Sequence, residues 1–138
     1  MDLNKQEYLD NDFDEITGEN KGILVEVLEI KNKSSQSGTP GFILKFGAIE
    51  GELSGRIIRK HYYITPKTEL FIRILAIACN LFEERLDDKG VLRKFVNPGF
   101  IPSDCVGCKL KIDTYIEDYN GEARTKVRNE KRISKDDF

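Results

Sequence analysis

Residues 22–33, GILVEVLEIKNK, alternate apolar and polar side chains and then change phase. Ile23, Val25 and Val27 share one face, whereas Leu28 and Ile30 continue with the opposite parity. Alternation with a period of two predicts a strand that has one buried face. A phase change within a strand is typical of a β-bulge, which bends the strand. A long, bent first strand suits a small closed barrel, because it must pair with neighbours on both sides.

Further strands are predicted on both sides of a central helix. Residues 42–46 alternate in the same way, and residues 55–64 form a third candidate strand after a turn at Glu50-Gly51-Glu52. Near the C-terminus, two alternating runs flank Asn120-Gly121. In the second run Arg124, Lys126 and Arg128 share one face, and Thr125 and Val127 share the other. This dipeptide predicts a hairpin, because a type I′ turn needs positive φ at both central positions.

The helix is predicted to start at Thr65-Pro66 and to continue for about twenty residues. An apolar stripe at helical spacing supports it, formed by Leu70, Phe71, Ile74, Leu75, Ala78, Leu81 and Phe82. Residues 91–104 contain two prolines and are expected to form a long connection. The order of elements predicts an all-β fold with one helix, namely a five-stranded OB-fold Greek-key barrel whose helix lies between strands three and four.

Composition and charge restrict the class of protein. The 138 residues suit a single domain, and no apolar run approaches the ~20 residues of a membrane helix. Residues 1–20 carry seven acids and one base, a net charge of −6; the whole chain carries −2, which leaves +4 for the remainder. We therefore expect an acidic N-terminal arm at 1–20, an OB-fold domain at 21–133 and a short acidic tip at 134–138.

The three cysteines and the first residues indicate a compartment. An odd number of cysteines, without the basic end and apolar core of a signal peptide, predicts free thiols in a reducing cytoplasm. Cys105 and Cys108 have zinc-knuckle spacing, and Cys79 and His61 could complete four ligands. A second cysteine pair is missing, so we expect no metal and no cofactor. With one histidine, no Gly-rich phosphate loop and no HExxH motif, we also expect no enzymatic activity.

A candidate nucleic-acid surface follows from cations interleaved with aromatic rings. Single-stranded nucleic acid needs cations for its phosphates and exposed rings on which bases stack. Over residues 45–63 there are four bases against two acids, a modest excess. Alternation requires one of Tyr62 and Tyr63 to face inward. Lys109, Lys111 and Tyr119 lie on the last hairpin. The predicted binding residues are Lys45, Arg56, Arg59, Lys60, His61, Tyr62, Tyr63, Tyr115, Arg124, Lys126 and Arg128.

Several short motifs resemble those of a phage and prophage family of small OB-fold proteins that bind single-stranded DNA. The motifs are Gly41-Phe-Ile-Leu-Lys-Phe46, Glu50-Gly-Glu-Leu-Ser-Gly-Arg-Ile-Ile58, Val106-Gly-Cys-Lys-Leu110 and Glu117-Asp-Tyr-Asn-Gly121. The likeness spans roughly residues 22–132. It implies a single-stranded-DNA-binding role in phage or prophage replication or recombination, in the cytoplasm of a bacterial host. It leaves open whether the protein forms a homo-oligomer.

The C-terminal residues offer a second kind of contact. Asp136, Asp137 and Phe138 resemble the acidic tips with which bacterial and phage single-stranded-DNA-binding proteins dock onto replication partners. This resemblance implies binding of replication or recombination proteins. The alternative interpretation of the whole chain is an OB-fold protein–protein adaptor that does not bind nucleic acid.

Overall fold

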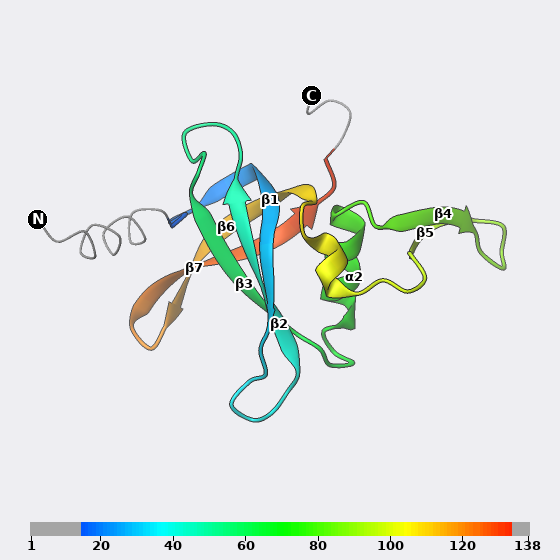
Figure 1. Cartoon of the computed structure of the whole chain (residues 1–138), viewed down its shortest axis with the longest axis horizontal. Helices are drawn as coiled ribbons and strands as arrows, with labels where there is room; N and C mark the ends of the chain where they lie inside the picture. The colour runs from blue at the N-terminus through cyan, green and yellow to red at the C-terminus, as the bar shows by residue number, and fades with distance from the viewer. Residues whose placement is uncertain (1–14, 134–138) are drawn as a thin grey trace, which may run out of the picture.

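A computed structural model describes residues 15–133 of the chain (Figure 1). Over these residues the fold is mostly β, with one α-helix and antiparallel sheets. The elements in chain order are β1 (Asn20–Asn32), β2 (Gly41–Ala48), β3 (Ile57–Tyr63), α2 (Glu69–Ala78), β4 (Phe82–Leu86), β5 (Leu92–Val96), the 3₁₀ turn η1 (Pro102–Cys105), β6 (Lys109–Tyr119) and β7 (Glu122–Lys131).

The bulge expected in the first strand is present. In β1, Val27 pairs with Phe46 and Glu29 pairs with Lys45, so Leu28 is the extra residue. Val27 is fully buried, while Leu28 turns outward and is 43% exposed. The side chain of Leu28 covers Gly47, where a Cβ would lie 2.6 Å from Leu28 Cδ1. The bulge therefore bends β1 and turns Leu28 onto Gly47, where a larger residue would force the Leu28 side chain to shift.

The five long strands form one antiparallel sheet in the order β3-β2-β1-β6-β7. The predicted hairpin is confirmed, since Asn120 and Gly121 both have positive φ, +52° and +85°. The prediction of a closed barrel is wrong, because β3 and β7 remain edge strands with no ladder between them. In Figure 1 the sheet curls so that β3 and β7 approach each other. The two edges are joined through side chains instead of backbone hydrogen bonds.

The helix is shorter than predicted and ends at Ala78. Asn80 takes up a left-handed conformation with φ of +65°. The Leu81 amide donates to the Ala76 carbonyl and the Asn80 amide to the Ile77 carbonyl, each at 2.9 Å. This is a Schellman C-cap with asparagine in the position that glycine usually takes. Leu81 and Phe82 thus continue the apolar spacing of the helix without belonging to it.

The long connection predicted at 91–104 contains regular structure. Its first part, β5, pairs with β4 in a separate two-stranded sheet. Within this hairpin the Arg85 guanidinium lies 4.1 Å from the centre of the Phe95 ring. The hairpin projects beyond α2, away from the β6–β7 turn (Figure 1). The sequence did not predict strands at residues 82–96, because an apolar stripe with helical spacing runs into them and two prolines follow them.

The core lies between the curled sheet and one side of α2. The helix contributes Leu75, Ala76 and Ala78, all at most 2% exposed, whereas Leu70 and Phe71 point outward. Ile16 is only 1% exposed, although it falls within the acidic arm expected at residues 1–20. The folded part of the chain therefore includes residues that precede β1. Within residues 15–133 the structure contains no helix with the length and apolarity needed to cross a membrane.

Candidate nucleic-acid interface

A groove runs along the seam between the two edge strands β3 and β7. It consists of three adjoining depressions of about 390, 320 and 320 Å³. The first and second share Arg59, Arg124 and Thr125, and the second and third share Lys60, His61, Tyr63, Tyr115 and Val127. Because neighbouring depressions share their walls, they form one channel, which we call the β3–β7 groove.

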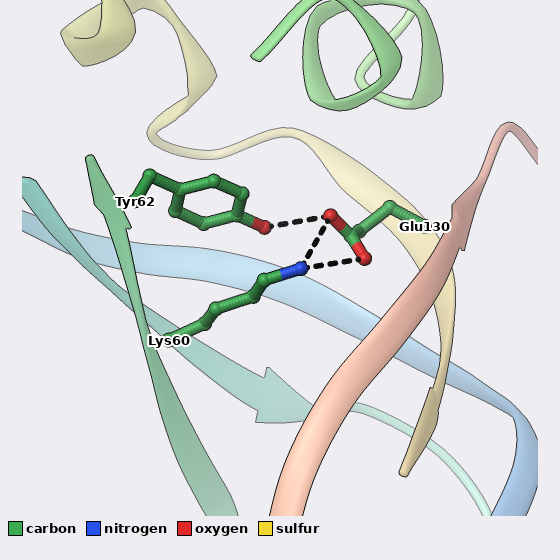
Figure 2. A network of polar contacts seen from close by, with 3 residues as sticks. All are labelled: Lys60, Tyr62 and Glu130. Atoms are coloured by element: carbon green, nitrogen blue, oxygen red, sulfur yellow. Dashed lines mark hydrogen bonds and ion pairs between the residues drawn. The ribbon is translucent and has the colours of Figure 1, made fainter. Parts of the chain in front are cut away.

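A buried ion pair crosses the seam beneath this groove (Figure 2). The Lys60 ammonium donates to both carboxylate oxygens of Glu130 at 3.1 Å, and the Tyr62 hydroxyl donates to one of them at 2.9 Å. The Glu130 side chain is 4% exposed and that of Lys60 is 24% exposed. Three polar groups thus hold together two strands that share no ladder, and each group has its partner.

A second bulge turns Glu130 inward. Asp113 pairs with Arg128 and Lys111 pairs with Lys131, so β7 contains one residue more than β6 over this interval. Asn129 adopts a positive φ of +59° there, and its side-chain amide donates to Asp113 at 2.8 Å. Without the extra residue, alternation from the buried Val127 would place Glu130 in solvent. Alternation in the sequence therefore did not predict an inward Glu130, and the local indication of the bulge was an asparagine within a strand.

The β3 wall of the groove carries a stacked pair of rings. The rings of His61 and Tyr63 lie 4.1 Å apart at an interplanar angle of 27°. The His61 Nε2–H donates to the Lys33 carbonyl at 3.1 Å, which holds this ring in place. Tyr63 is 40% exposed, whereas Tyr62 is 3% exposed. Tyr63 is therefore the outward tyrosine of the pair, and its ring is available for stacking.

The opposite wall carries three cations that alternate with inward side chains. Arg124, Lys126 and Arg128 are exposed, while Val127 is buried between them. The Arg128 guanidinium lies 4.4 Å from the centre of the Tyr115 ring, and that of Arg124 lies 4.7 Å from the centre of the Tyr119 ring. Burial and the neighbouring Glu117 carboxylate raise the pKa of Tyr115, so this ring stays neutral. With Arg59 on the β3 wall, four exposed cations lie along the groove.

The structure brings most of the predicted binding residues together. The exceptions are Lys45 and Arg56, which do not line the groove. Lys60 and Tyr62 belong to the groove but point inward, toward Glu130, and form its floor. Lys109 and Lys111 also lie outside the groove walls. The predicted partner-binding residues Asp136, Asp137 and Phe138 lie outside the described residues.

The three cysteines that had suggested zinc lie in or against the hydrophobic core, where Cys79 follows α2 and Cys105 ends η1. Cys79 and Cys105 are 4% and 0% exposed. They share a hydrogen bond that raises the pKa of Cys79 and lowers that of Cys105. His61 is occupied by its stack on Tyr63. Among residues 15–133, no group of three or more His, Cys, Asp or Glu side chains is arranged to hold a metal ion.

The buried tyrosine of the floor predicts a loss of stability at alkaline pH. Burial and the Glu130 carboxylate raise the pKa of Tyr62 well above its usual 10.0. The folded protein therefore keeps this proton above pH 10 while the unfolded chain releases it, so stability falls as pH rises. We expect a Tyr62 contribution of about 1.4 kcal/mol per pH unit above about pH 10. Urea unfolding at several pH values should show a shallower decline for Tyr62→Phe; equal slopes would contradict the assignment.

Comparison with known proteins finds no match to this chain, either among models of protein families or among curated proteins.

Proposed function

We propose that this protein binds single-stranded DNA in the β3–β7 groove. The observation that carries the proposal is the His61–Tyr63 stack, whose exposed tyrosine faces Arg124, Lys126 and Arg128 across the groove. Such proteins combine a cationic groove that follows the phosphates with rings on which bases stack. The resemblance of the sequence to phage and prophage proteins extends the proposal to replication or recombination, with the tip at Asp136, Asp137 and Phe138 as a partner contact.

The proposed fold is an OB-fold that is open along one seam. In a five-stranded Greek-key barrel, the first strand pairs with the second and fourth, and the third strand meets the fifth. The order β3-β2-β1-β6-β7 supports this assignment, with β6 and β7 as the fourth and fifth strands and β4–β5 as an inserted hairpin. The Lys60–Glu130 pair takes the place of the missing pairing.

Stacking on Tyr63 can be tested by titrating the protein into a fluorescent oligothymidine of about 16 nucleotides. Tyr63→Ala should weaken binding by ~1–3 kcal/mol, the usual contribution of one base–aromatic stack. Tyr63→Phe keeps the ring and should bind as the wild type does. An oligouridine of the same length distinguishes DNA from RNA.

The titration also tests the function itself. Contacts to phosphates release counterions, so the logarithm of the association constant should fall linearly with the logarithm of salt concentration, by ~0.7 per phosphate. An isotherm that does not change with salt, or no binding at low salt, would exclude the proposed function.

A protein–protein adaptor is the second candidate, and one observation favours it. The outer face of α2 exposes apolar side chains, with Leu70 59%, Phe71 53% and Ile74 37% exposed. Exposed apolar patches often mark contacts with other proteins. Failure of the DNA titration would favour this function.

A further inference from the structure

The N-terminal arm enters the folded domain at one end of the groove. Glu15 forms a parallel bridge with Ile57 at the start of β3, and the Ile16 amide donates to the Ile57 carbonyl at 2.7 Å. On the other side, the Gly18 amide donates to Thr125 Oγ1 of β7 at 3.1 Å. Because Ile16 is 1% exposed, this attachment is buried and holds the arm at the seam.

The charge of the arm is complementary to that of the groove. Residues 1–14 contain one lysine and five acids, Asp2, Glu7, Asp10, Asp12 and Asp14. The next acid, Glu15, lines the first depression together with Arg59 and Arg124. The arm thus continues from a residue that lines the same depression as two of the four groove cations.

The arm is long enough to reach the rest of the groove. Fourteen extended residues span up to ~46 Å, at ~3.3 Å per residue. The seven residues of β3 that form one wall span only ~23 Å. The arm can therefore fold back along the whole wall from its attachment at Glu15.

We propose that residues 1–14 act as an intramolecular competitor that occupies the β3–β7 groove when nucleic acid is absent. This inference rests on the proposed function, because the carboxylates of the arm would take the positions of phosphates on Arg59, Arg124, Lys126 and Arg128. A tethered segment acts at an effective concentration of order millimolar, so a dissociation constant of ~0.1 mM for the arm keeps about nine-tenths of the groove occupied. Salt screens these pairs, and the competition should fade as ionic strength rises.

The test compares two variants of the full chain with the same change in charge. Asp10→Asn, Asp12→Asn and Asp14→Asn together neutralise part of the arm. Glu83→Gln, Glu84→Gln and Asp88→Asn neutralise three exposed acids on or beside the β4–β5 hairpin, outside the groove. At low salt we expect the arm variant to bind oligothymidine about threefold to tenfold more tightly than the wild type, because more of the groove is free. The hairpin variant should gain much less, and the variants should converge at high salt.

A second measurement tests the arm without nucleic acid. In amide NMR spectra of the free protein, the arm variant should shift the signals of Arg59, Arg124 and Lys126, and the hairpin variant should leave them in place. Shifts without DNA binding by any variant would support the arm contact while excluding the proposed function. DNA binding that is unchanged or weakened in the arm variant, or groove signals that do not move, would overturn the inference.

Discussion

Replacing Arg59, Arg124, Lys126 and Arg128 together by alanine is expected to lower the affinity for single-stranded DNA by two to three orders of magnitude. Each phosphate contact on a single strand releases ~0.7 of a counterion, which is worth about 1 kcal/mol at about 0.1 M salt. Four lost contacts should therefore cost about 4 kcal/mol and reduce the salt slope by about 3. Fluorescence anisotropy at several salt concentrations measures both quantities.

A matched variant separates this effect from a change in net charge. Lys21, Arg73, Lys89 and Lys94 are exposed and lie outside the groove. Replacing these four by alanine should change affinity less than tenfold and leave most of the salt slope in place. Folding should survive in the groove variant, because exposed cation–π contacts such as Arg128 on Tyr115 contribute only ~0.5–1 kcal/mol each. Equal losses in the two variants would show that binding does not depend on the groove.

Glu130→Ala is expected to destabilise the protein by about 3–5 kcal/mol. The substitution leaves the Lys60 ammonium and the Tyr62 hydroxyl without their partner, and Tyr62 is 3% exposed. Breaking a buried pair by removing one partner costs this much because the remaining charge has lost its compensation. Since the pair also joins β3 to β7, the loss should appear as a lower urea midpoint for the whole fold.

Two further variants show whether the cost arises from the buried network. Glu122→Ala removes the same charge from an exposed position of β7, where Glu122 approaches Arg124 at 3.5 Å, and should change stability by at most ~0.5 kcal/mol. Lys60→Met and Tyr62→Phe combined with Glu130→Leu replace the whole network by apolar side chains and should recover much of the loss. A cost below ~1 kcal/mol for Glu130→Ala would show that the ion pair does not hold the seam.

In the predicted helix, the spacing of apolar residues did not decide which face is buried or where the helix ends. Leu70, Phe71 and Ile74 have helical spacing, and so do Ile72, Leu75 and Cys79 on the neighbouring side. Packing against the sheet buries Leu75 and Cys79, partly buries Ile72, and leaves the first set exposed. The same periodicity also continued through Leu81 and Phe82, although Asn80 ends the helix before them. Two apolar stripes on one helix are equivalent until a partner surface selects one of them.

In the candidate site, too, the sequence predicted some features and only the tertiary structure decided others. Alternation on the last strand correctly separated Arg124, Lys126 and Arg128 from Val127, because side chains of a strand point to opposite faces whatever the strand contacts. It could not decide whether Tyr62 or Tyr63 faces outward, since both faces of β3 carry polar and aromatic groups. The structure assigns Tyr62 to the floor because Glu130, 68 residues later in the chain, accepts its hydroxyl hydrogen.

The sequence by itself determined the strands of the main sheet, the bulge at Leu28 and the Asn120-Gly121 turn. Each depends on side-chain alternation or on backbone preferences within a few residues. Only the tertiary structure decided that β3 and β7 stay unpaired, that Glu130 turns inward at Asn129 and that Ile16 fills the core. These features depend on contacts between distant segments, whose free energy comes from shared burial and from pairing of desolvated charges. The periodicity of side chains along a short segment cannot predict contacts between segments that are far apart in the chain.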